Sequence, residues 1–182
     1  MPPVVDSFVA LDLETSGLDP NRHGIIEAAL IRYEGGRETA VWHSLIDPGI
    51  PLHPEATLIH GLTSRDLEGA PRFAEVAEEL LAFLGEGPPL AYYAAFDYRF
   101  LRAAAQRLEL AVPPLNRWLD PLPLVRSRLG KGKASMENAC RIYGVDPGEA
   151  HRALDDARAA ARIWLLVNES GDGSGDRTGG GA

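Results

Sequence analysis

Two acidic residues interrupt an apolar run near the start of the chain. Asp12 and Glu14 lie one residue apart within residues 5–14, a stretch otherwise typical of a buried strand. Side chains alternate between the two faces of a strand, so both carboxylates project from one face, about 6 to 7 Å apart. Like charges this close repel each other, and burying them without a partner is costly. The pair therefore predicts a positive partner that its own strand does not supply.

Two further carboxylates are expected to point inward from helices. Asp97 precedes two apolar positions of an expected helix by three and four residues, although an N-cap aspartate explains it equally well in isolation. Asp156 follows Ala153 by three residues on the core stripe of the last helix. Its neighbour Asp155 lies about 100° further round and is expected to face water. An Asp–Asp pair early in a helix can also be surface charge that complements the helix dipole.

The four carboxylates carry more weight together than singly. If Asp12, Glu14, Asp97 and Asp156 converge, their repulsion is tolerable only when divalent cations neutralise it. Hard oxygen ligands favour Mg²⁺ or Mn²⁺ over zinc. Four negative charges match two such ions, and a pair of metals about 3.5 to 4 Å apart is a device for phosphoryl transfer.

His151 is the residue expected to handle protons at this site. A residue five positions before Asp156 would lie about 140° away on an ideal helix, so His151 is placed in the loop that leads into the last helix. From there it could act as a general base that takes a proton from the attacking water. The alternative is a surface loop histidine, which is how we interpret His23, His43 and His53.

The elements that must position these residues follow from hydrophobic periodicity. Strands are expected at residues 5–13, 25–33, 39–46, 90–95 and 117–119, with a hairpin turn at 34–37. Helices are expected at residues 73–84, 97–108, 136–143 and 153–167. Residues 51–71 are rich in turn formers and are expected to be irregular. Three strands followed by alternating strands and helices predict a mixed α/β sheet covered by helices.

Composition limits the class of protein. The chain has 182 residues, 45% of them hydrophobic, and a net charge of −8, which argues against a wide basic surface for duplex DNA. It does not argue against an enzyme that holds a short nucleic-acid end through metal ions. Cys140 is the single cysteine, so no internal disulfide is expected and a reducing cytoplasm is the natural location. We expect no signal peptide and no membrane association.

Four sequence blocks resemble one known family, the DnaQ-like 3′–5′ exonucleases of the DEDDh group. The blocks are ALDLETSGL at 10–18, IHGLT at 59–63, AAFDYRFL at 94–101 and HRALDDA at 151–157. One block would be weak evidence, but four in the right order are strong. The resemblance covers residues 7–167, so we expect an exonuclease domain at 1–168 and a disordered Gly/Ser/Asp tail at 169–182.

The resemblance implies a ribonuclease-H-like fold with a mixed five-stranded sheet whose second strand is antiparallel. It implies hydrolysis of phosphodiester bonds at single-stranded or frayed 3′ ends, with release of nucleoside 5′-monophosphates. Carried over by position, the four carboxylates would hold two Mg²⁺ (or Mn²⁺), and His151 would activate the water. The residues that would contact the terminal nucleotide are Thr15, Ser16, Leu18, His60 and Phe96.

The sequence departs from the family pattern before the third block. Members usually have His-Asn where Tyr92 and Tyr93 stand here. Two tyrosines near the site could stack on a base of the substrate. Alternatively, they are strand-forming residues that pack against helices.

The cellular role is open between several alternatives. DNA is favoured over RNA as substrate, with a DNA polymerase or a repair protein as a conceivable partner and a stand-alone enzyme as the alternative. A non-catalytic nucleic-acid-binding relative and a phosphatase with an aspartyl nucleophile are the other classes. The basic cluster of Arg126, Arg128, Lys131 and Lys133 is either a solvated surface or a guide for the substrate backbone.

Overall fold

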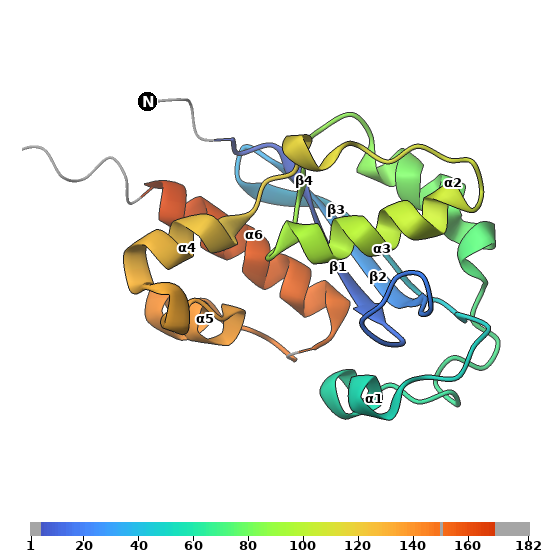
Figure 1. Ribbon diagram of the computed structural model, residues 1–182. Coiled ribbons are helices and arrows are strands. Elements are labelled where there is room, and N and C mark those ends of the chain that lie inside the picture. Colours follow the sequence, from blue (N-terminus) through green and yellow to red (C-terminus); the bar gives the residue numbers. More distant parts are fainter. Residues whose placement is uncertain (1–4, 150, 170–182) are drawn as a thin grey trace, which may run out of the picture.

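The computed structural model describes residues 5–149 and 151–169 and contains one mixed sheet (Figure 1). Its strands are β1 (Phe8–Thr15), β2 (Ile25–Glu34), β3 (Arg37–Leu45) and β4 (Pro89–Leu90), in the order β3-β2-β1-β4. β2 is antiparallel to both β1 and β3, and β4 is parallel to β1. The expected mixed sheet with an antiparallel second strand is therefore confirmed.

Helices cover both faces of the sheet (Figure 1). They are α1 (Pro54–His60), α2 (Phe73–Leu84), α3 (Ala94–Gln106), α4 (Pro121–Leu129), α5 (Met136–Tyr143) and α6 (Ala153–Glu169), with 3₁₀ turns η1 (Leu115–Arg117) and η2 (Lys131–Lys133). None of the helices within the described ranges has the length and apolarity that crossing a membrane requires.

Alternation along β1 places its carboxylates on the face that α6 covers. Val9, Leu11 and Leu13 belong to the core cluster shared with α2 and α3. Phe8 and Ala10 point the other way and pack with α6. Because strand side chains have a period of two, the residues at positions 12 and 14 continue this second face, which changes from apolar to acidic toward the end of β1.

The strand expected at residues 90–95 is wrong beyond Leu90, because α3 begins at Ala94. The carboxylate of Asp120 accepts hydrogen bonds from the backbone N–H groups of Tyr93 (3.0 Å) and Ala94 (3.1 Å). Tyr93 itself has a left-handed backbone with φ of 65°. A distant side chain thus satisfies N–H groups that would otherwise lack partners at the start of a helix, and the chain turns into α3 early.

The fifth strand expected at 117–119 is reduced to one residue. Leu119 forms an isolated parallel bridge with Leu90, and η1 occupies residues 115–117. Asp120 then caps α4 by accepting from the N–H of Leu122, and Pro121 stands at the first helical position. This capped helix immediately after the bridge leaves no room for a longer strand, because Pro121 cannot donate to a ladder.

The expectation that residues 51–71 are irregular is wrong at α1. The His53 side chain accepts from the N–H of Glu55, Pro54 follows, and Gly61 closes the helix in the left-handed conformation. In Figure 1, α1 lies beyond the ends of β1 and β2. The other expected helices are present, with α3 displaced toward the N-terminus, and Ser135 caps α5 as expected. Of the expected tail, Glu169 is the last residue of α6, and residues 170–182 lie outside the described residues.

Candidate active site

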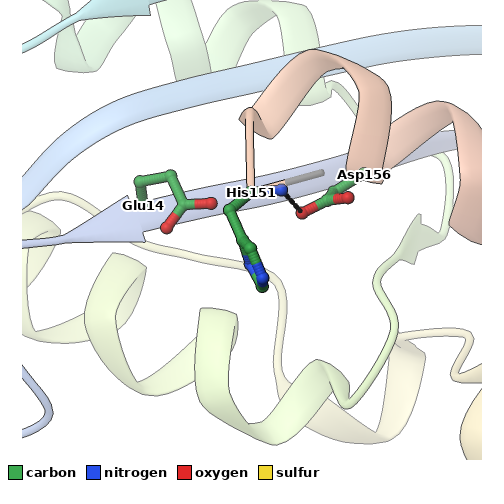
Figure 2. A group of neighbouring side chains, drawn as sticks. All are labelled: Glu14, His151 and Asp156. Carbon is green, nitrogen blue, oxygen red and sulfur yellow. Dashed lines mark hydrogen bonds between the residues drawn. The ribbon is translucent and has the colours of Figure 1, made fainter. Parts of the chain in front are cut away.

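Three of the expected site residues meet at the end of β1 (Figure 2). One ligand atom each of Glu14, His151 and Asp156 lies within 4.8 Å of the other two. Figure 2 shows Glu14 projecting from β1 toward His151, which precedes the first turn of α6. His151 thus lies in the loop before the last helix, as its spacing from Asp156 predicted.

The loop that carries His151 has an unusual backbone conformation. His151 has a φ of 62°, in the left-handed region that side-chain-bearing residues seldom adopt. Its backbone N–H donates a 3.1 Å hydrogen bond to Oδ2 of Asp156. Asp156 therefore holds the backbone of His151 while its carboxylate stays in the group of three.

Asp155 is turned away from this group. Its carboxylate accepts from the backbone N–H of Glu149 at 3.0 Å and contacts the Arg158 guanidinium at 3.4 Å. The geometry thus agrees with the choice of Asp156 over Asp155 as the inward carboxylate.

Asp97 reaches the end of β1 from α3, whereas Asp156 reaches it from α6. It is buried in the first turn of α3, and its Oδ1 accepts from the backbone N–H of Leu13 at 3.1 Å. β4 pairs with β1 at Val9 and Ala10 and ends there, which leaves the N–H of Leu13 available to a side chain. The N-cap alternative for Asp97 is wrong, because Tyr93 occupies that position of α3.

The carboxylates of the site repel one another. Burial raises the pKa of Asp12 well above its usual range, and the charges of Asp97, Glu14 and Asp156 raise it further. Burial, followed by the charge of Asp156, raises the pKa of Glu14 to about 8. Burial also raises the pKa of Asp156 to about 6, although His151 opposes the shift. Asp12 and Asp97 lie outside the group of Glu14, His151 and Asp156, but the charges of all three other carboxylates act on Asp12.

This donor set fits divalent cations. The oxygens are hard ligands, they come from β1, α3 and α6, and their ionisation is suppressed by burial and mutual repulsion. A cation placed among them would reverse that suppression. The residues present therefore suit Mg²⁺ or Mn²⁺ better than a softer metal.

A cavity of about 310 Å³ adjoins the end of β1. Of the residues expected to contact a nucleotide, those that line it are Thr15, Leu18, His60 and Phe96. Burial lowers the pKa of His60, which favours its neutral imidazole. Leu18 is 72% exposed, so its apolar side chain is accessible beside the cavity.

Ser16 is not among the residues that line this cavity. It is fully buried, and its hydroxyl accepts from the N–H of Gly24, so its side chain closes the loop after β1. His23 and His53, interpreted as surface loop histidines, line the cavity instead. A Cβ atom at Gly17 would lie 2.5 Å from the His23 ring, so glycine is needed for this packing.

The two tyrosines that replace His-Asn have different environments. The Tyr92 hydroxyl donates to the carbonyl of Ala134 at 2.9 Å, and its ring packs against the clusters beneath α5 and α6. The packing alternative therefore holds for Tyr92. Tyr93 is 50% exposed and remains accessible, although it does not line the cavity.

The basic cluster lies on α4 and η2. All four residues are exposed, and Arg128 also donates to the carbonyl of Val167 on α6.

One buried acidic residue beside the site was not predicted from the sequence. Glu27 on β2 is 1% exposed and pairs in register with Glu14. A single glutamate inside the apolar run IIEAALI was the available signal. His43, interpreted as a loop residue, lies on β3 and its Nε2 is 2.7 Å from the Glu27 carboxylate.

The chain is similar in sequence to bacterial DNA polymerase III proteins. The chain is 36% identical over 163 residues to the PolC-type DNA polymerase III of Thermotoga maritima, covering 90% of this chain but 12% of that protein. It is 29% identical over 164 residues to the DNA polymerase III epsilon subunit of Aquifex aeolicus, covering 90% of this chain and 81% of that one.

Solved structures share the fold. Exonuclease X in complex with 5′ overhanging duplex DNA is 28% identical, with a TM-score of 0.68 over 90% of this chain and 93% of that one. The nuclease domain of 3′hExo, a DEDDh family member bound to rAMP, is 21% identical, with a TM-score of 0.71 over 92% and 93% of the two chains. The expected ribonuclease-H-like α/β fold is therefore confirmed. The sequence model of the RNase_T exonuclease family matches residues 9–164, and the chain belongs to that family.

Proposed function

We propose that this protein is a metal-dependent 3′–5′ exonuclease that removes nucleoside 5′-monophosphates from single-stranded or frayed 3′ ends. The observation that carries the proposal is the meeting of Glu14, His151 and Asp156 within 4.8 Å, beside a cavity at the end of β1. Asp97 joins the same strand end through Leu13. Membership of an exonuclease family supports the same activity.

The residues that would hold two Mg²⁺ (or Mn²⁺) are Asp12, Glu14, Asp97 and Asp156. When bound, such ions neutralise clustered carboxylates and stabilise negative charge on a phosphate that is being transferred. The raised pKa values of Glu14 and Asp156 support this assignment, because burial and neighbouring carboxylates disfavour the ionised form of both groups.

His151 would act as the general base. Its imidazole is exposed, so a proton accepted from the attacking water can pass on to solvent. In the reaction the water oxygen forms a bond to phosphorus, the bond from phosphorus to the 3′ oxygen breaks, and that oxygen leaves as a hydroxyl after protonation. The hydrogen bond from the backbone N–H of His151 to Asp156 would keep the imidazole beside the carboxylates.

The cavity would receive the terminal nucleoside. Leu18 and Phe96 offer apolar surfaces against which a base can pack, and Thr15 and His60 supply polar groups. Tyr93 is exposed at the start of α3 and would stack on a base of the nucleic acid upstream of its terminal nucleotide.

DNA is the proposed substrate, because the relatives of highest identity named above are a PolC-type DNA polymerase III and a DNA polymerase III epsilon subunit. A DNA polymerase is accordingly the proposed partner. The chain spans 12% of the PolC-type relative, so the association is proposed for this nuclease unit alone.

The test is digestion of matched 5′-labelled DNA and RNA strands with paired and mispaired 3′ ends, in Mg²⁺, in Mn²⁺ and in EDTA. We expect a ladder that shortens from the 3′ end with either metal, release of mononucleotides, faster cleavage of DNA, and no cleavage in EDTA. The Asp12→Ala protein, purified identically, controls for contaminating nucleases. Binding without cleavage in both metals would leave a non-catalytic binding protein, and release of inorganic phosphate without shortening would indicate a phosphatase.

A further inference from the structure

Glu27 is a buried carboxylate that the chemistry above does not use. It is 1% exposed on β2, and the strand register sets it directly opposite Glu14. Opposed residues on neighbouring strands project to the same face, so two glutamates lie side by side in the sheet. Such a charge must be paired and hydrogen-bonded to be tolerated.

The partners of Glu27 come from two different parts of the fold. Oε1 accepts from Nε2 of His43 at 2.7 Å and from a terminal guanidinium nitrogen of Arg152 at 3.1 Å. Oε2 accepts from Nε of Arg152 and from the backbone N–H of Ala153, both at 3.4 Å. Burial by itself would raise the pKa of Glu27, but the hydrogen bonds from His43 and Arg152 lower it on balance.

Arg152 and Ala153 are the two residues that follow His151 in the chain. Ala153 is the first residue of α6, where backbone N–H groups lack partners within the helix. The Glu27 carboxylate accepts from the N–H of Ala153, and its two oxygens also accept from the guanidinium of Arg152. On the other side, Asp156 accepts from the N–H of His151. The left-handed backbone of His151 is thus held between two carboxylates, one on β2 and one on α6.

We propose that Glu27 is a positioning residue for His151: it anchors Arg152 and the start of α6 to the sheet, and so fixes where the imidazole stands relative to Glu14. It touches neither substrate nor water in this role. The inference depends on the proposed exonuclease function for its kinetic readout, while its structural readout is independent of activity.

The first variant is Glu27→Gln, which keeps the shape of the side chain. The amide nitrogen would face donors at His43, Arg152 or Ala153, so at least one anchor is lost. We expect kcat on single-stranded DNA to fall about 10- to 100-fold, the usual effect of removing a partner that orients a functional side chain, with little change in KM. Hydrogen exchange of the amides of His151 and Ala153 should accelerate in the metal-free protein, whereas exchange in the centre of β1 should not.

The matched control is His43→Gln, which removes the partner of Glu27 that does not belong to the His151 segment. We expect kcat to stay within about twofold of wild type, as for a surface substitution. Arg152→Gln, by contrast, should lower kcat as Glu27→Gln does. Combining Glu27→Gln with Arg152→Gln should cost no more than the worse single change, because both remove one interaction.

The outcomes separate this inference from the proposed function. If wild-type protein cleaves nucleic acid and folded Glu27→Gln or Arg152→Gln retains its full kcat, the positioning role is wrong. An equal loss in His43→Gln would show that Glu27 merely holds the sheet together. If Glu27→Gln does not fold, Arg152→Gln alone decides. If wild-type protein is inactive, the proposed function fails, and unchanged exchange at His151 and Ala153 in Glu27→Gln would still refute the anchor.

Discussion

The backbone N–H of Leu13 donates to the carboxylate of Asp97 at 3.1 Å across 84 residues of sequence. This bond brings α3 against the strand between Asp12 and Glu14, at the edge where β4 has already ended. The Asp97 carboxylate thereby accepts the hydrogen bond that a neighbouring strand would otherwise accept from Leu13. The same bond holds Asp97 beside the other carboxylates of the site. The periodicity suggested a helix that begins at Asp97. Because α3 begins at Ala94 instead, Asp97 is preceded by three helical residues.

Removing Asp12 should abolish cleavage without unfolding the protein. We expect Asp12→Ala to retain less than about a tenth of the wild-type rate, because a carboxylate of the proposed metal site is lost. In EDTA the variant should melt at the same or a higher temperature than wild type, since the repulsion that raises the pKa of Asp12 is relieved. Cleavage assays and thermal melts in EDTA check both halves. Substantial residual activity would end the assignment of Asp12 as a ligand.

The neighbouring aspartates of α6 should differ sharply. Asp156→Ala removes the acceptor of the His151 N–H and a member of the acidic group, and should leave almost no activity. Asp155→Ala loses contacts with Glu149 and Arg158 and should leave the rate nearly unchanged. The two variants, assayed side by side on one labelled strand, control for each other. Equal losses of cleavage rate in the two variants would mean that Asp156 is not distinguished from Asp155 by its inward orientation.

His151→Ala should slow the chemical step rather than weaken substrate binding. The expected loss in kcat is about 10² to 10⁴-fold, the usual contribution of a general base. KM should change little, because the imidazole is not among the groups that line the cavity. Steady-state kinetics on a short single strand measure both constants. A large rise in KM with kcat preserved would instead make His151 a binding residue.

Stability without metal should fall as the pH rises. The folded pKa of Glu14 is raised from 4.5 to about 8, so its folded state keeps a proton that the unfolded chain releases. The resulting stabilisation is complete below pH 4.5 and is lost as the pH rises through about 8. Asp156 acts in the same direction between 3.8 and about 6, and the lowered pKa of Glu27 acts in the opposite sense.

Thermal melts in EDTA across this pH range measure the effect, with Mg²⁺ added in a parallel series. We expect Mg²⁺ to raise the melting temperature most at high pH, where the carboxylates are forced to ionise. Glu14→Gln is the control, and its melting temperature in EDTA should depend less on pH. A metal-free wild-type protein that becomes steadily more stable toward pH 8 would contradict the raised pKa values of Glu14 and Asp156.

Reversing the charge of η2 should affect long substrates selectively. Lys131 and Lys133 are exposed, so their replacement by Glu should not disturb the core. We expect a higher KM on long single strands at low salt and little change on very short ones, because repulsion acts on the phosphates beyond the site. Kinetics on a length series of labelled strands test this. Identical constants at every length and at moderate salt would leave the cluster a solvated surface.

Local patterns determined most of the framework and the acidic set. The period-two alternation of β1 placed Asp12 and Glu14 on one face, and the helical period of α6 separated Asp156 from Asp155. The hairpin of β2 and β3, the helix α2 and the cap of α5 also follow from residues near one another in the chain. In each case the signal lies within a short stretch of the chain, where side-chain direction depends mainly on spacing.

Tertiary contacts decided the rest. Asp120 sets the start of α3 from 26 residues away, which no local period encodes. Tyr92 bonds to Ala134 across 42 residues and becomes a packing residue. Glu27 meets Arg152 across 125 residues, so a lone glutamate in an apolar strand acquires a partner only once α6 docks on the sheet. The chain specifies which side chains face inward, but which of them meet depends on how the helices pack, because burial selects partners by distance in space.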